Sequence, residues 1–367
     1  MPPLSVLIKP VSSSCNMRCR YCFYRDVAEH REQASLGIMS DGTLDNIIRR
    51  AAAYADSEID FSFQGGEPTL AGLDFYKALI RAEKKYNSKG LIIHNSLQTN
   101  GYNISDELMD LFAREGFLLG VSLDGTPELH DAYRLDADGR GTSARVLETI
   151  ARLERHGVDF NILCVVNSLV AAHPKECFEY LKKYKYIQYI PCLDGFSGAK
   201  NDCSLTPEAY TGFLKESFDL YYAAFVHGSP VSIRSFDNYI SILLGRQPES
   251  CGMCGRCGLY FMIEADGSVY PCDFYGLDKW CMGNINSSSF FKLVKSPVSE
   301  KFIADSLPVP EQCRACKWYG LCRNGCRRER EPLESGTVAI NKWCGCYKEF
   351  FEYSAERMQR MADALAK

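Results

Sequence analysis

Strand-like and helix-like segments alternate from the N-terminus to about Asp194, and this alternation constrains the fold more than any other feature. The runs that predict strands are Ser5–Pro10, Ile59–Gln64, Leu91–Gln98, Phe117–Leu123, Val158–Val166 and Tyr186–Leu193. The amphipathic stretches that predict helices are Asp41–Tyr54, Phe75–Tyr86, Asp106–Arg114, Ser143–Arg155 and Pro174–Lys183, with Ser40 and Ser105 as N-caps. Short connections between such units imply parallel strands and right-handed crossovers. The chain is therefore α/β, either an open sheet or a partial (β/α)6 barrel, with chemistry at the carboxyl ends of the strands.

Three cysteines follow the first predicted strand with the spacing C-x3-C-x2-C: Cys15, Cys19 and Cys22. Three thiolates cannot close a four-ligand zinc site, but they can hold three irons of a cubane iron–sulfur cluster. The fourth iron then stays open to a small molecule. A disulfide or a structural metal knuckle is the alternative for this spacing. Because the chain has 18 cysteines and no apparent secretory signal, metal ligation is favoured over disulfides.

Charge and hydropathy exclude two classes of partner. The net charge is −4 and the sequence has no sustained basic stripe, so no nucleic-acid partner is expected. We also expect no membrane partner, because no apolar run is long enough to span a bilayer. The apolar segment Leu4–Ile8 is too short for a signal peptide. These features predict a cytoplasmic protein.

With aromatic residues on both sides of its last cysteine (Tyr21 and Phe23), the first motif resembles that of radical S-adenosylmethionine (SAM) enzymes. The resemblance implies that its cysteines hold a [4Fe–4S] cluster whose open iron binds SAM, and it favours the partial barrel. It also implies SAM-pocket residues, which are Tyr21, Gly65, Gly66, Glu67, Ser122 and Arg134. Tyr24 and Gln64 are added to the predicted pocket because they lie beside the cluster motifs.

Each part of this pocket has a reason and an alternative. The paired glycines allow close approach to the backbone, and the Glu67 carboxylate can accept hydrogen bonds from an ammonium group. The alternative for the segment that contains these glycines and Glu67 is an ordinary turn without a ligand. For Ser122 and Arg134, which would hold the SAM carboxylate or ribose, the alternatives are an N-terminal cap and a surface cation. Tyr24 and Gln64 could equally serve local packing.

The organisation changes near Asp202. Two further helices are predicted at Pro207–Val226 and Phe236–Leu244, a β-hairpin with an Asp-Gly turn at Phe261–Tyr270, and a C-terminal helix from Tyr347 to Leu365. The predicted domains are a barrel at 1–203, a helical linker at 204–250 and a small cysteine-rich domain at 251–367.

The cysteines of this tail resemble the SPASM extension of radical SAM enzymes, which carries auxiliary clusters. The resemblance implies two auxiliary [4Fe–4S] clusters, one held by Cys251, Cys257, Cys272 and Cys326 and the other by Cys313, Cys316, Cys322 and Cys344. Spacing alone does not fix this partition. A zinc ribbon of Cys313, Cys316, Cys322 and Cys326 is an alternative, and Cys254 or Cys346 could replace a neighbouring ligand.

The whole chain resembles the anaerobic sulfatase-maturating enzymes, most closely in the strings at residues 61–73, 95–101, 160–166 and 267–275. These enzymes oxidise a cysteine or serine of a client sulfatase to Cα-formylglycine without oxygen. The resemblance implies SAM and three [4Fe–4S] clusters as cofactors. Its expected partners are a sulfatase segment of the form Cys/Ser-x-Pro/Ala-x-Arg and an electron donor such as flavodoxin or ferredoxin.

The resemblance also implies a mechanism and a base. A 5′-deoxyadenosyl radical takes a hydrogen atom from Cβ of the target residue, and a nearby base takes a proton. Asp273, adjacent to Cys272, matches the proposed catalytic aspartate of the family. A carboxylate bonded to backbone amides at the hairpin end is the alternative. Two other functions remain open: a SPASM maturase that forms thioether or carbon–carbon crosslinks, and a zinc-binding protein-interaction module.

Overall fold

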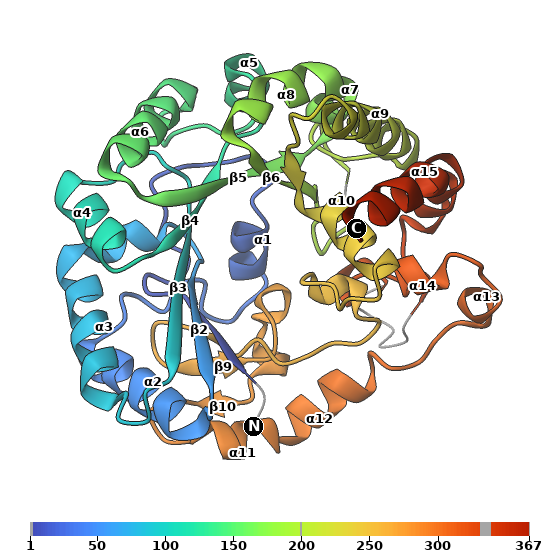
Figure 1. Cartoon of the computed structure of the whole chain (residues 1–367). Helices are drawn as coiled ribbons and strands as arrows, with labels where there is room; N and C mark the ends of the chain where they lie inside the picture. The colour runs from blue at the N-terminus through green and yellow to red at the C-terminus, as the bar shows by residue number, and fades with distance from the viewer. Residues whose placement is uncertain (1–2, 199, 331–338, 367) are drawn as a thin grey trace. The chain divides into compact units, whose positions relative to one another are not determined.

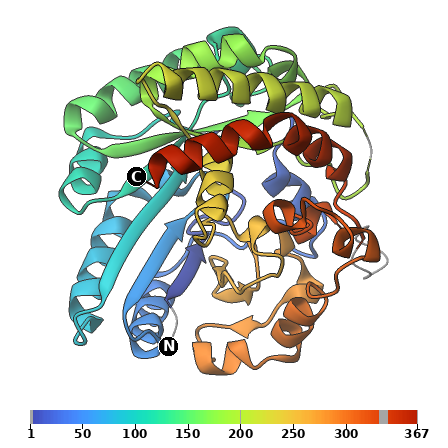
Figure 2. The ribbon, with the colours of Figure 1, turned by 45° about the vertical axis from the view of Figure 1, so that its right-hand side comes forward.

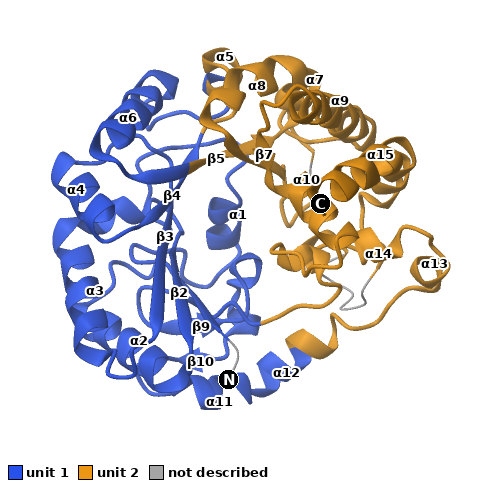
Figure 3. Cartoon of the chain, viewed as in Figure 1, with its two compact units in different colours: residues 1–122, 131–160, 259–301 blue, residues 123–130, 161–258, 302–367 orange. Residues whose placement is uncertain are grey.

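The computed structural model describes residues 3–198, 200–330 and 339–366. The chain packs as two compact units, coloured in Figure 3. The first consists of residues 1–122, 131–160 and 259–301, and the second of residues 123–130, 161–258 and 302–367. Packing defines these units, so the domain boundaries given above stay a prediction.

The first unit is built on four parallel strands in the order β1-β2-β3-β4 (Figure 1). They are β1 (Leu4–Ile8), β2 (Glu58–Phe63), β3 (Ile92–Thr99) and β4 (Leu118–Ser122). The helices that alternate with them are α1 (Phe23–Glu29), α2 (Asp41–Tyr54), α3 (Gly72–Tyr86), α4 (Asp106–Arg114) and α6 (Ser143–His156). Both predicted N-caps are confirmed, because Ser40 and Ser105 accept hydrogen bonds from the third residue of their helices.

The predicted hairpin of the cysteine-rich tail is confirmed and joins this same sheet. Strand β8 (Met262–Ile263) pairs antiparallel with β9 (Ser268–Tyr270) and parallel with β1, while β10 (Gly283–Asn284) continues the sheet beyond β9. Gly267 has φ +90°, which the tight turn requires. The sequence pattern did not predict that the hairpin extends the first sheet. Short elements follow it: Asp273–Tyr275, Asp278–Trp280, α11 (Phe290–Val294) and α12 (Pro297–Ala304).

The second unit has three parallel strands, which are β5 (Asp159–Val166), β6 (Tyr186–Pro191) and β7 (Ser232–Ile233). Its helices are α5 (Pro127–Asp131), α7 (Ser168–Ala172), α8 (Pro174–Leu181), α9 (Pro207–Val226), α10 (Arg234–Leu243), α13 (Glu311–Arg314), α14 (Tyr319–Cys322) and α15 (Cys344–Leu365). Figure 2 shows α15 running along α9. Aromatic rings pack α15 against both α9 and α10: the Phe350 ring lies 5.7 Å from that of Phe218 in α9 and 5.6 Å from that of Phe236 in α10.

The predicted strands and helices agree with those observed to within a few residues at each end. The largest differences, three residues each, are at α3, which begins at Gly72 rather than Phe75, and at α15, which begins at Cys344 rather than Tyr347. Helix α1, which starts directly after the cysteine motif, was not predicted. Over the described ranges, no helix is long and apolar enough to cross a membrane.

Candidate active site

The loop that carries the first three cysteines connects β1 to α1, and backbone hydrogen bonds fix it. The N–H groups of Arg18 and Arg20 donate to the carbonyls of Leu135 and Tyr133 at 2.7 and 3.0 Å. All three thiols are partly buried. A loop held in this way can present its sulfurs without support from a regular element of secondary structure.

The turn after β2 packs directly on this loop. Gly66 donates its N–H to the carbonyl of Ser12 at 3.0 Å, and Glu67 donates to that of Ser14 at 2.8 Å. A Cβ on Gly66 would lie 1.8 Å from the Ser14 carbonyl oxygen, and Gly65 has φ +115°. The close approach that the paired glycines permit is therefore taken by the chain's own backbone. Their contact with SAM stays a prediction.

The Glu67 side chain is 1 % exposed and ties the ends of β2 and β3 together. Its Oε1 accepts hydrogen bonds from the Thr69 N–H and hydroxyl and from the Thr99 hydroxyl, and its Oε2 accepts the Asn100 N–H at 2.7 Å. Burial raises the pKa of Glu67, and these hydrogen bonds oppose the rise. Its role toward the SAM ammonium group stays a prediction, because its observed partners all belong to the chain.

Asn100 is a site residue that the sequence did not single out. Its Nδ2 lies 3.6 Å from Cys15 Sγ and 2.8 Å from Asn16 Oδ1. Burial raises the pKa of the Cys15 thiol, while hydrogen bonds from the Met17 N–H and from Asn100 act in the other direction. The only signal in the sequence was its place at the end of a predicted strand, next to Gly101.

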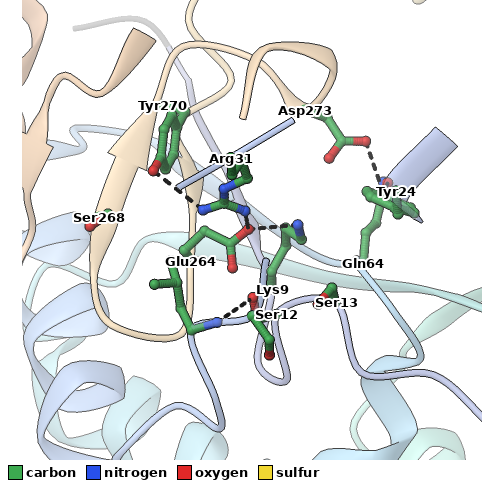
Figure 4. Close-up of polar contacts among 12 residues, drawn as sticks. Lys9, Ser12, Ser13, Tyr24, Arg31, Gln64, Glu264, Ser268, Tyr270 and Asp273 are labelled. Carbon is green, nitrogen blue, oxygen red and sulfur yellow. Dashed lines mark hydrogen bonds and ion pairs between the residues drawn. The ribbon is translucent and has the colours of Figure 1, made fainter. Parts of the chain in front are cut away.

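Asp273 begins a short helical turn directly after Cys272 and is hydrogen-bonded to a tyrosine. The Tyr24 hydroxyl lies 2.8 Å from Asp273 Oδ2 and 2.8 Å from Gln64 Oε1 (Figure 4). A hydroxyl has one proton, so we assign it to Asp273 and orient the Gln64 amide to donate to the tyrosine oxygen. Asp273 Oδ1 is buried with no partner among the described residues. Burial raises the pKa of Asp273 to about 6, against the opposing effects of Lys9 and Tyr24.

Beside this carboxylate lies a buried ion network that the sequence analysis missed. Glu264 Oε1 bonds Lys9 Nζ at 2.6 Å and Arg31 Nη1 at 2.6 Å (Figure 4). The Lys9 ammonium also lies 5.2 Å from the centre of the Tyr24 ring. These contacts connect the residue directly after β1, the segment after α1 and the hairpin, so they hold together the elements that carry Tyr24 and Asp273.

Two further pocket residues predicted from the sequence have distinct surroundings. Arg134 is 7 % exposed, and its guanidinium lies 5.4 Å from the centre of the Tyr21 ring. The alternative that it is a surface cation is therefore wrong. Ser122 is the last residue of β4, at the carboxyl end of the sheet, where the prediction placed it.

Four cysteines of the second unit gather around one cavity. It is lined by Cys313, Cys316, Cys322 and Cys344 together with aromatic residues at the start of α14 and in α15. Burial raises the pKa of Cys322 to about 11, and the three other thiols contribute to the rise. All 18 cysteines lie in the described part of the chain, and each is a thiol rather than half of a disulfide. This donor set fits a four-thiolate cluster.

Cys326 belongs to a different group of thiols. Burial raises its pKa, and Cys251 and Cys257 are among the neighbours that raise it further. This grouping separates Cys326 from the other members of the zinc ribbon considered above. Cys346 is buried and donates to the Pro207 carbonyl at 3.2 Å. The exposed Cys254 lies near Cys251.

No three His, Cys, Asp or Glu side chains in the described ranges converge tightly enough to hold a single metal ion. An iron–sulfur cluster contains several irons, so its thiolates stand farther apart than the ligands of one ion. Cys313, Cys316, Cys322 and Cys344, which line one cavity, suit a cluster both by their number and by their proximity.

Comparison with known proteins gives consistent matches. Residues 10–183 match the Radical SAM superfamily, and residues 251–317 match the iron–sulfur cluster-binding SPASM domain. The chain is 44 % identical to a cysteine-type anaerobic sulfatase-maturating enzyme of Clostridium perfringens, over 99 % of both proteins. It is 31 % identical to a serine-type enzyme of Bacteroides thetaiotaomicron, over 99 % of this chain and 92 % of that one.

A solved structure is similar in fold over nearly the whole chain. Native anSMEcpe with bound AdoMet (SAM) and Cp18Cys peptide superposes with a TM-score of 0.95 at 44 % identity, covering 99 % of this chain and 100 % of the other. The predicted α/β fold, a radical SAM domain followed by a SPASM domain, is confirmed. Because the similarity extends over nearly the whole of both proteins, the chain belongs to the anaerobic sulfatase-maturating enzymes, which are radical SAM enzymes with a SPASM domain.

Proposed function

We propose that the protein oxidises a cysteine of a client sulfatase to Cα-formylglycine without oxygen. The observation that carries the proposal is the buried Asp273 carboxylate, which has one oxygen without a partner in the described structure and the other held by Tyr24. A carboxylate in that state can take the thiol proton of a substrate. Identity of 44 % to cysteine-type relatives, against 31 % to serine-type ones, supports cysteine as the target.

The cofactors of this family are SAM and [4Fe–4S] clusters, and the cysteines supply suitable ligands. In our proposal Cys15, Cys19 and Cys22 hold the SAM cluster. The auxiliary clusters take two sets of ligands, Cys251, Cys257, Cys272 and Cys326, and Cys313, Cys316, Cys322 and Cys344. When bound, these groups supply a 5′-deoxyadenosyl radical that removes a hydrogen atom from Cβ and an acceptor for the remaining electron.

Residues of the chain itself accept the substrate's proton and hold the accepting carboxylate in position. Asp273 takes the proton from the substrate sulfur, so that loss of a hydrogen atom, a proton and an electron leaves a thioaldehyde. Water converts the thioaldehyde to the aldehyde and releases hydrogen sulfide. Tyr24 and Gln64 hold the carboxylate in place through the hydroxyl contact already described. The remaining SAM contacts that we propose are Tyr21, Gly65, Gly66, Glu67, Ser122 and Arg134.

The partners follow from the same proposal. The client presents a Cys/Ser-x-Pro/Ala-x-Arg segment, and a flavodoxin or ferredoxin supplies the electron. A reducing cytoplasm suits a chain whose 18 cysteines are all thiols. The two family matches fall within residues 1–203 and 251–367, the barrel and SPASM domains of our proposal.

Anaerobic turnover tests the proposed function directly. We expect the iron-reconstituted protein, given SAM, a reductant and a Cys-x-Pro-x-Arg peptide, to release 5′-deoxyadenosine and an aldehyde-bearing peptide, both read by mass spectrometry. The matched serine peptide serves as the control for target type. 5′-Deoxyadenosine without modified peptide would contradict the sulfatase assignment, and a crosslinked peptide would point to another SPASM maturase.

Removal of single cysteines tests the ligand assignment. We expect Cys322→Ala to lower the bound iron by about four atoms per chain, because it opens one [4Fe–4S] site. Cys346→Ala should leave the iron content unchanged, since its thiol is engaged with the Pro207 carbonyl. Iron analysis of both variants after anaerobic reconstitution measures the difference. Equal losses in the two variants would show that Cys346 is a ligand and that the partition is wrong.

A further inference from the structure

The carboxyl end of β3 presents an amide to the first cysteine loop. Asn100 is 9 % exposed, and its Nδ2 lies 3.6 Å from Cys15 Sγ, within hydrogen-bonding distance for a sulfur acceptor. The other hydrogen of the same amide points to Asn16 Oδ1 at 2.8 Å. Both donors of this side chain are therefore directed into the loop.

Neighbouring groups fix the orientation of this amide. Asn100 Oδ1 accepts the backbone N–H of Tyr102 at 2.8 Å. A flipped amide would set its NH2 group against that N–H, two donors face to face, so Nδ2 must be the atom that faces Cys15. The backbone N–H of Asn100 is held as well, by Glu67 Oε2 at 2.7 Å.

Glu67 makes the arrangement rigid. Its other oxygen accepts the hydroxyl of Thr99, the residue before Asn100, at 2.9 Å. The carboxylate, Thr99 and Asn100 are all buried, which strengthens the hydrogen bonds and excludes water as a competitor. The donor to Cys15 is therefore already in place before any reaction begins.

We propose that Asn100 is a positioning residue that raises the reduction potential of the cluster on Cys15, Cys19 and Cys22 through an N–H···S hydrogen bond to Cys15. The inference rests on the proposed function, because it takes these cysteines as cluster ligands. Reduction adds one electron from the external donor and therefore negative charge to the cluster and its sulfurs. A hydrogen bond to a ligand sulfur is stronger in the more negative state, so it favours reduction.

The test is a redox titration followed by electron paramagnetic resonance, on the full iron-reconstituted protein. The signal that changes when SAM is added identifies the relevant cluster among the three. Two uncharged variants remove the amide N–H donor: Asn100→Leu, and Asn100→Ser, whose shorter side chain can still accept from the Tyr102 N–H through its hydroxyl oxygen in a similar turn. We expect each to lower the equilibrium constant of reduction at least tenfold, a shift of about 59 mV for one electron.

Asn95→Leu is the matched control, because Asn95 is a buried asparagine of β3, the strand that Asn100 follows, and its amide bonds Glu83 at 3.3 Å instead. Its midpoint should equal that of the wild type. An unchanged midpoint in Asn100→Ser, or an equal fall in Asn95→Leu, would overturn the inference. A wild-type protein without any SAM-responsive cluster signal would overturn the proposed function itself, so the two failures are distinguishable.

Discussion

The Asp273→Asn variant is expected to form formylglycine about 10²–10⁴-fold more slowly than the wild type, the usual contribution of a general base. Asparagine keeps the size of the side chain and can still accept from the Tyr24 hydroxyl, but it cannot take a proton. SAM cleavage does not need this proton transfer. The ratio of 5′-deoxyadenosine to formylglycine should therefore rise, and mass spectrometry of both products measures it.

The control for this variant lies on the same hairpin. Asp266 sits at the exposed turn, where it accepts hydrogen bonds from the Ser268 N–H and hydroxyl. Asp266→Asn removes one carboxylate charge from the same segment without touching the buried site, and we expect normal turnover. Unchanged formylglycine formation in Asp273→Asn would end the assignment of the base. Equal losses in both variants would mean that hairpin stability, and not proton transfer, limits the reaction.

Local patterns predicted the regular elements well. Asp41–Tyr54 and Asp106–Arg114 begin and end where the sequence placed them, because an N-cap serine and an apolar stripe mark each helix. The prediction that the first three cysteines are cluster ligands came from their spacing and from the aromatic residues beside the last of them. These features depend on residues only a few positions apart, so a single sequence contains them.

Contacts between residues far apart in the chain could not be predicted from such local patterns. The hairpin near residue 265 was predicted, but its parallel pairing with β1 joins segments about 255 residues apart in the chain. That pairing brings Glu264 to Lys9, and neither residue had a local signal of function. Asn100 was missed for the same reason, since only the folded chain shows that its amide faces Cys15. The cysteine partition, by contrast, came from family resemblance and not from spacing.

Glu264 gives the largest expected effect on stability. Its carboxylate is fully buried between Lys9 and Arg31, whose side chains are 2 % and 1 % exposed. Burial alone would raise the pKa of Glu264, but the two adjacent cations outweigh burial and hold it below the ordinary value. A lowered pKa means that the charged carboxylate stabilises the fold at all pH values above its unfolded-state pKa of about 4.3. The contribution is lost only as the pH falls through the lower folded value, so measurements near neutral pH include all of it.

Glu264→Ala should therefore destabilise the protein by about 3–5 kcal/mol, because it leaves two cations buried without their shared anion. Anaerobic thermal unfolding of the iron-loaded protein measures the loss as a lower melting temperature. Glu29→Ala is the control: it breaks the Arg25–Glu29 pair, whose side chains are 66 % and 58 % exposed, and exposed pairs contribute little. Similar melting temperatures for the two variants would show that the buried network adds no net stability. In that case the hairpin would owe its place beside β1 to backbone pairing and apolar contacts alone.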